Sequence, residues 1–174
     1  MRLFTAIDPP SETMEKLEGF LARLRPLAKL RWSPTANLHI TTKFIGEWPE
    51  ARLDDMKSAL AAVRCASFQV SIKGIGWFPD ARRPRVFWTG VDGGKALRAL
   101  AHGTEQAVAA LGVAVEQKPY SPHLTLARVN GAFHAGSLTE AAGDPDFGTF
   151  EVASFFLYLS SNGKYSKLAE FPLI

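Results

Sequence analysis

The sequence predicts an α+β fold made of two similar lobes that face each other. Three observations lead to this prediction. Strand-like and helix-like segments are mixed along the 174 residues, no Gly/Ser linker or low-complexity tract divides them, and a His-x-Thr strand occurs once in each half. The two histidines, His39 and His123, are separated by about half the chain. We therefore expect a single domain, residues 1–174, with one motif in each lobe.

Hydrophobic periodicity and local breakers define the order of the elements. We expect Ser11 to be the N-cap of the first helix, Gly112 to end the third, and Gly74 with Gly76 to bend the strand that contains them. The expected helices are 11–28, 49–64, 95–111 and a short one at 138–142 within a loop over 130–148. The expected strands are 3–7, 38–45, 68–75, 85–91, 123–129, 150–160 and 165–173.

Composition and charge are those of an ordinary globular protein. Apolar residues make up 47% and charged residues 21% of the chain. No apolar run approaches the ~18 residues of a membrane span, and the first ten residues are too short and too soon interrupted for a signal peptide. We expect a cytoplasmic protein that does not contact a membrane. The net charge of +3 permits a polyanionic ligand without indicating one.

The two motifs, His39-Ile40-Thr41 and His123-Leu124-Thr125, place a histidine and a threonine on one face of a strand, because residues i and i+2 point the same way. An imidazole beside a hydroxyl is a good ligand for phosphate oxygens. Two such pairs could hold a phosphodiester from both sides, with one histidine accepting a proton and the other donating one. The spacing does not say which histidine is the acid.

The sequence offers less support for a functional role of the other two histidines, or for a metal site. The segment His102-Gly103-Thr104 also matches the pattern, but it falls in an expected helix, where i and i+2 do not share a face. His134 lies in an expected loop. Around the two motifs only Glu47 and Glu116 are acidic, without ligand-like spacing, and the single Cys65 excludes a cysteine-rich metal site. We expect no metal and no cofactor.

The residues around the motifs resemble a known family. The stretches Leu38–Glu47 and Ser121–Arg128 resemble the paired signatures of the 2H phosphoesterase superfamily, in its branch of RNA 2′,3′-cyclic phosphodiesterases, formerly called 2′-5′ RNA ligases. The resemblance covers most of the chain, since it extends to residues 78–79, 83–91, 156–161, 165 and 171–173. Thr42 departs from the family pattern, which more often has an aliphatic residue there.

The resemblance implies a bilobal fold of mainly antiparallel sheet, with outer helices around a central cleft, and a metal-free reaction. It implies that RNA 2′,3′-cyclic phosphate ends are hydrolysed to 2′-phosphates. We expect a monomer, with tRNA fragments among the candidate substrates. By motif position, His39 would give a proton to the departing 3′ oxygen and His123 would activate water. Thr41 and Thr125 would hold the nonbridging phosphate oxygens.

Basic and aromatic side chains supply further candidates for RNA contact. Arg128 lies on the strand face opposite His123 by simple alternation, yet could reach the phosphate from the strand end. Arg83 and Arg85, with Arg82, lie in or beside a loop that could border the cleft. The candidates for stacking on a terminal base are Trp32, Phe44, Trp77 and Tyr120.

Three alternatives stay open from the sequence. The same site could carry out 2′-5′ RNA ligation, or it could open another cyclic phosphate on a small nucleotide. A third alternative is a module that binds phosphorylated RNA ends without turning them over.

Overall fold

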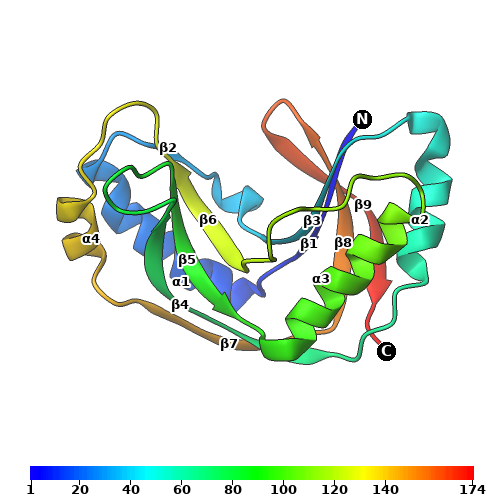
Figure 1. Cartoon of the computed structure of the whole chain (residues 1–174). Helices are drawn as coiled ribbons and strands as arrows, with labels where there is room; N and C mark the ends of the chain where they lie inside the picture. The colour runs from blue at the N-terminus through cyan, green and yellow to red at the C-terminus, as the bar shows by residue number, and fades with distance from the viewer.

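The computed structural model describes residues 1–174, which form two lobes that share one antiparallel sheet (Figure 1). The strands are β1 (Arg2–Ile7), β2 (Arg31–Trp32), β3 (Ile40–Glu47), β4 (Phe68–Phe78), β5 (Val86–Asp92), β6 (His123–Arg128), β7 (Asp146–Val152), β8 (Ser154–Ser161) and β9 (Lys164–Pro172). The α-helices are α1 (Ser11–Leu24), α2 (Leu53–Ala61), α3 (Gly94–Ala109) and α4 (Gly136–Ala142). Short 3-10 turns are η1 (Arg25–Leu27), η2 (Thr35–Asn37) and η3 (Glu50–Arg52).

The strand order β7-β4-β5-β6-β3-β1-β8-β9 divides between the lobes, and β2 pairs with the outer part of β6. One lobe holds β7, β4, β5 and β6; the other holds β3, β1, β8 and β9. They meet where β3 pairs with β6 through one residue pair, Ile40 opposite Leu124. The expected two-lobed α+β fold is confirmed.

Two of the helices follow a strand of one lobe in the chain but pack against the other lobe. Helix α1 follows β1 in the chain, yet it packs with α4 and β7 on the opposite lobe. Helix α3 follows β5 and likewise packs against β3 and α2 on the other lobe (Figure 1). Because the chain crosses between the lobes repeatedly, neither lobe is a continuous stretch of sequence.

A continuous apolar core lies beneath the sheet and the helices. Its fully buried members include Phe87 and Phe155, together with Ile40 and Leu124 at the junction of the lobes. The middle residue of each His-x-Thr motif therefore points into the core. No helix is both long and apolar enough to span a membrane.

Two expected elements were wrong. The strand expected over 150–160 is two strands, because the chain leaves the β7 edge of one lobe at Ala153 and joins β1 in the other as β8. Strand β7 begins at Asp146, within the expected loop. The bend at Gly74 is confirmed, since its φ is +73° and the β4–β5 register shifts between Lys73 and Ile75.

Candidate active site

The two His-x-Thr segments lie side by side at the junction of the lobes. Ile40 pairs with Leu124 in antiparallel register, and both side chains are fully buried. The flanking histidines and threonines therefore point to the opposite face, where all four are half-buried. The same register sets His39 beside Thr125 and Thr41 beside His123. The structure thus brings the four predicted side chains together.

His39 is fixed by hydrogen bonds from both ring nitrogens. Nδ1 lies 2.6 Å from the Asn37 carbonyl oxygen, which can only accept, so Nδ1 carries a proton. Nε2 lies 2.8 Å from Oγ1 of Thr41. In the neutral ring the threonine hydroxyl donates to Nε2, and in the imidazolium Nε2 donates to the hydroxyl. Protonation of His39 therefore frees the Thr41 proton for another acceptor.

A hydrogen bond to a backbone carbonyl also orients His123. Its Nδ1–H donates to the carbonyl oxygen of Ser121, two residues earlier, over 2.8 Å. The ring packs edge-on against Phe78, with centroids 4.8 Å apart and planes at 89°. Both rings are therefore held through Nδ1, which leaves Nε2 as the nitrogen for proton transfer.

The pKa values of both histidines are shifted in the same direction. Burial lowers the pKa of His39, and it also lowers the pKa of His123. The carbonyl hydrogen bonds oppose this in each case, and the charge of Arg128 adds to the lowering at both rings. Only His39 has a carboxylate, Asp8, that favours its protonated form.

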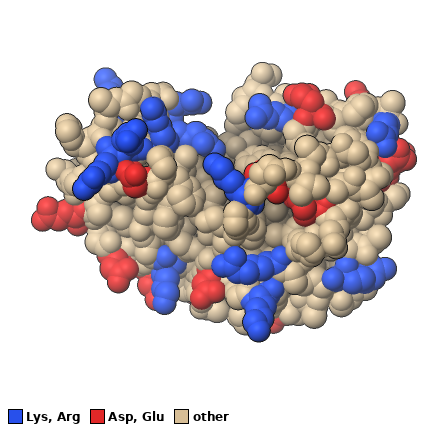
Figure 2. Space-filling model, in the orientation of Figure 1, with Lys and Arg blue, Asp and Glu red and all other residues tan.

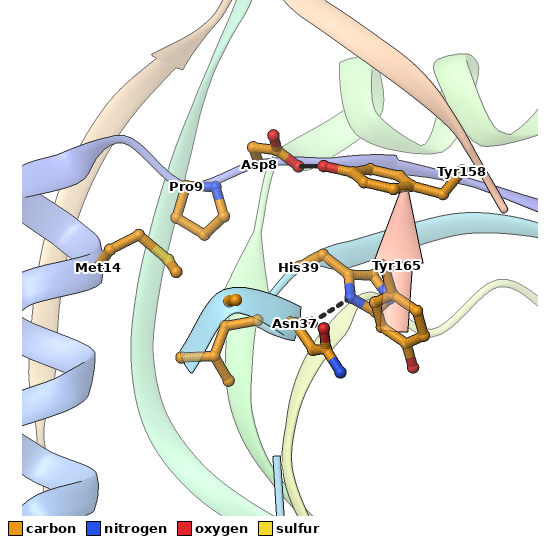
Figure 3. A pocket seen from close by; sticks show the side chains of 9 residues that line it. Asp8, Pro9, Met14, Asn37, His39, Tyr158 and Tyr165 are labelled. Atoms are coloured by element: carbon orange, nitrogen blue, oxygen red, sulfur yellow. Dashed lines mark hydrogen bonds between the residues drawn. The ribbon is translucent and has the colours of Figure 1, made fainter. Parts of the chain in front are cut away.

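A small cavity of about 100 Å³ lies beside His39 (Figure 3). Tyr158 and Tyr165 line it, with the Tyr165 ring edge-on to His39 at 5.2 Å between centroids. The Tyr158 hydroxyl donates to Asp8 over 2.6 Å, and Nζ of Lys167 lies 2.6 Å from the other Asp8 oxygen. Asp8 is thus fixed near His39, while one cation balances its charge.

A larger groove of about 700 Å³ begins at Thr41 and His123 and runs along α3. Phe44 lines it and is 64% exposed, and the Tyr120 hydroxyl donates to the Thr41 carbonyl over 2.8 Å. His102 also lines this groove, although it lies on α3 rather than on a strand. The groove gives the histidines a neighbouring space of nucleotide size.

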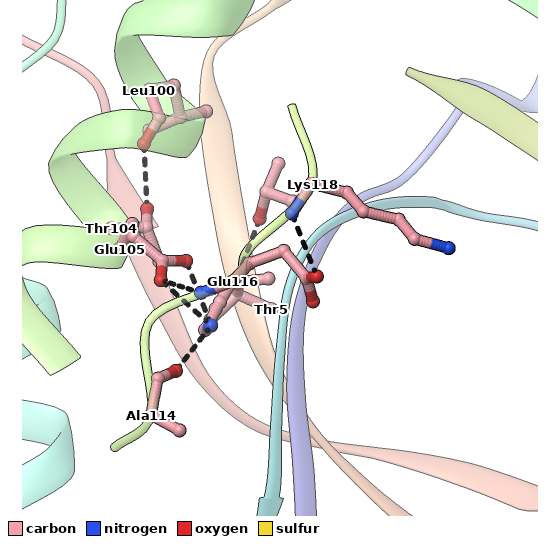
Figure 4. Close-up of polar contacts among 9 residues, drawn as sticks. Thr5, Leu100, Thr104, Glu105, Ala114, Glu116 and Lys118 are labelled. Atoms are coloured by element: carbon pink, nitrogen blue, oxygen red, sulfur yellow. Dashed lines mark hydrogen bonds and ion pairs between the residues drawn. The ribbon is translucent and has the colours of Figure 1, made fainter. Parts of the chain in front are cut away.

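A partly buried ion pair holds the segment that leads to His123 (Figure 4). Nζ of Lys43 lies 2.9 Å from one Glu105 oxygen and also donates to the Ala114 carbonyl over 3.1 Å. Glu105 in turn accepts from the backbone N–H of Glu116 over 2.7 Å. These contacts fix residues 114–118 between α3 and β3.

Arg128 lies on the same face as the motif, so the face assigned to it by simple alternation was wrong. Along β5 the alternate residues Gly90, Trp88 and Val86 pair with His123, Thr125 and Arg128. A register shift after Phe87, a β-bulge in β6, adds the extra residue that reverses the alternation. Nothing in the sequence pattern marks this bulge.

The other candidates separate into exposed and core residues. Arg83 and Arg85 are exposed. Trp77 is buried and stacks on Phe87 at 4.5 Å between centroids, and Trp32 packs against the same ring at 6.2 Å, so both indoles belong to the core. Sequence reasoning missed Asp8 and Tyr158, because neither lies near a motif in the chain.

The fold and the paired motifs define a phosphoesterase of the two-lobed type. A family model described as LigT like Phosphoesterase matches residues 7–88. The chain belongs to this LigT-like family of 2H phosphoesterases. A protein of Aeropyrum pernix named RNA 2′,3′-cyclic phosphodiesterase is 36% identical over 148 residues, which are 80% of this chain and 84% of that protein. One of Archaeoglobus fulgidus with the same name is 32% identical over 158 residues, covering 90% and 89%.

Solved structures agree over the whole chain. TT0787 of Thermus thermophilus superposes with a TM-score of 0.80 at 30% identity, covering 99% of this chain and 98% of that chain. E. coli LigT complexed with 3′-AMP gives a TM-score of 0.80 at 26% identity, covering 99% and 97%.

Proposed function

We propose that the protein hydrolyses the 2′,3′-cyclic phosphate at an RNA end to a 2′-phosphate. The observation that carries this proposal is the pair of histidines on one sheet face, each with Nδ1–H bound to the carbonyl two residues earlier. The relatives named RNA 2′,3′-cyclic phosphodiesterase support the same activity. No cluster of three or more His, Cys, Asp or Glu side chains is arranged to hold a metal ion.

The reaction follows from two proton transfers at the Nε2 atoms. His123, neutral, takes a proton from water as the water oxygen bonds to phosphorus. The bond between phosphorus and O3′ breaks, and protonated His39 gives its Nε2 proton to O3′. The products are a 2′-phosphate and a 3′-hydroxyl. Each transfer contributes on the order of 10²–10⁴-fold, and together they provide for both the nucleophile and the leaving group without a metal.

We assign the role of general acid to His39 because one neighbouring carboxylate favours its protonated form. Asp8 favours the protonated form of His39, whereas no carboxylate does so for His123. The threonines complete the site. Once His39 is protonated, the Thr41 hydroxyl can donate to a nonbridging phosphate oxygen, and Thr125 is placed to do the same beside His39.

The groove along α3 accepts the terminal nucleotide in this proposal. Phe44 offers an exposed ring for the base, and Arg128, on the face of the histidines, offers a cation for the phosphate. A relative, E. coli LigT, has been crystallised with 3′-AMP, which supports nucleotide binding in this fold.

The test is product analysis on a defined oligonucleotide that ends in a 2′,3′-cyclic phosphate, with EDTA present. We expect ring opening at an undiminished rate and a 2′-phosphate as the product. A 3′-phosphate product, or complete dependence on added metal, would contradict the proposal. Cyclic mononucleotides, other cyclic phosphates and 2′-phosphate plus 5′-hydroxyl ends, compared by kcat/KM, separate this reaction from ligation and from other substrates.

A further inference from the structure

Five exposed arginines come from β2, the loop between β4 and β5, and the end of β6, and we call them the arginine surface: Arg31, Arg82, Arg83, Arg85 and Arg128. Arg31 on β2 is directly opposite Arg128 on β6. Residues opposite each other in an antiparallel pair share a face, so Arg31 lies on the face that carries His123 and Thr125. Arg31 is one strand farther out, about 4.8 Å from β6.

The charges of this surface are not compensated within the protein. None of its five arginines takes part in a salt bridge, whereas Arg25 pairs with Glu18 and Arg52 with Asp55. The one carboxylate of the loop, Asp80, accepts hydrogen bonds from the backbone N–H groups of Arg82 and Arg83. Figure 2 shows blue atoms crowded over the upper part of the lobe that contains β2, β5 and β6, with little red among them.

Two like charges directly opposite each other on a sheet destabilise it, so the Arg31–Arg128 pair has a cost in the free protein. An anion between them would remove that cost. Arg128 lies on the same sheet face as His123 and Thr125, so the arginine surface borders the candidate active site. A chain of phosphates that starts at the histidines and leaves past β2 fits this distribution of charge.

We propose that Arg31 binds the phosphodiester that links the terminal nucleotide to the one before it, with Arg82 and Arg83 contacting phosphates farther along the strand. This inference rests on the proposed function and names its substrate class: RNA chains of two or more nucleotides rather than free cyclic nucleotides. Arg31 contacts substrate away from the reacting atoms, so it contributes binding and not proton transfer.

The experiment compares two substrates that differ by one phosphodiester, a nucleoside 2′,3′-cyclic phosphate and a dinucleotide with the same end. We expect Arg31→Gln to lower kcat/KM about 10-fold on the dinucleotide and to leave the mononucleotide unchanged. Arg31→Lys, which keeps the charge, should restore part of the loss. Arg64→Gln is the matched control, because Arg64 is exposed, forms no salt bridge and lies at the end of α2 in the other lobe.

Binding supplies a readout that does not depend on turnover. The affinity for a 5′-labelled oligonucleotide that ends in a 2′-phosphate should fall with salt, and Arg31→Gln should reduce the slope of log K against log salt by about 0.7. An equal loss on both substrates, or no loss in activity and affinity, overturns the inference. If the wild-type protein opens neither substrate, the proposed function fails, and the binding series still decides whether Arg31 contacts RNA.

Discussion

The two His-x-Thr strands are built alike and differ in what surrounds them. Each histidine donates from Nδ1 to the carbonyl two residues earlier, and each motif buries its middle residue at the junction of the lobes. His39, however, lies among Phe4, Tyr165 and the Asp8–Tyr158 pair, while His123 packs against Phe78 without a carboxylate. The backbone thus orients the two rings alike, and in the proposed mechanism it is the neighbouring side chains that distinguish the acid from the base.

The largest expected effect comes from removing either histidine. His39→Ala and His123→Ala should each lower kcat by about 10²–10⁴-fold on a 2′,3′-cyclic phosphate end, because each loses one proton transfer. Steady-state kinetics on folded protein, checked by circular dichroism, measures this. His134→Ala is a control, and its rate should equal that of the wild type.

The same two variants show which histidine is the general acid and which is the general base. A p-nitrophenyl phosphodiester has a leaving group that needs little protonation, so His39→Ala should lose much less on it than on the cyclic phosphate. His123→Ala should lose as much on both, because water must still be activated. The opposite pattern would reverse the assignment.

The segments that lead into the two histidines are anchored differently. Lys43 is 7% exposed, and its pair with Glu105 fixes the segment before His123. Lys43→Met should lower the free energy of unfolding by about 3 kcal/mol, since it leaves a carboxylate without its partner in a largely buried site. Urea denaturation measures this. A change below about 1 kcal/mol would show that Glu105 finds another partner or water.

Replacing either threonine tests the two phosphate contacts against each other. Thr41→Val and Thr125→Val keep the shape and remove one hydroxyl, so each should cost about 10-fold to 100-fold in kcat/KM. Thr125→Ser should recover most of the activity. If Thr41→Val lowers only the folding stability, its hydroxyl serves His39 and does not contact the phosphate.

Asp8 provides the sharpest test of the difference between the histidines. Its charge raises the pKa of His39 against the lowering by burial, His123 and Arg128. Asp8→Asn should therefore lower that pKa, and Lys167 limits the change because it already balances part of the Asp8 charge. The alkaline limb of the bell-shaped kcat/KM profile, where His39 loses its proton, moves to lower pH.

The acid limb, set by His123, should stay in place in that variant. Tyr158→Phe, which removes the hydroxyl bonded to Asp8 and keeps the charge, is the control and should shift the profile less. Movement of both limbs together would indicate a general change in the cleft rather than an effect on His39.

The sequence predicted the parts of this site that depend on local alternation. His39, Thr41, His123 and Thr125 follow from strand period alone, and helices α1, α2 and α3 follow from apolar periodicity. The sheet face of Arg128 could not be predicted in this way, because a β-bulge in β6 reverses the alternation, and that bulge depends on the partner strand. Asp8 comes near His39, and Arg31 comes opposite Arg128, only through strand pairing between distant segments, which one sequence does not record.

The smallest expected effect concerns the hydrogen-bonded group of Glu18, Arg25 and Thr35, which precedes His39 in the chain. The Arg25 guanidinium and the Thr35 hydroxyl both donate to Glu18, and they lower the pKa of Glu18 to about 2. Thr35 begins η2, whose Asn37 carbonyl orients His39. Because the pair is only partly shielded from solvent, Glu18→Gln should reduce the free energy of unfolding by only about 0.5 kcal/mol at pH 7. A carboxyl whose folded pKa is lowered stabilises the fold above its unfolded pKa, near 4.5 here, and loses that contribution as pH falls toward 2. The difference in free energy of unfolding between wild type and variant, measured by thermal unfolding, should therefore shrink as pH falls over this range. A difference that stays constant with pH would show that the Glu18 charge does not stabilise the fold.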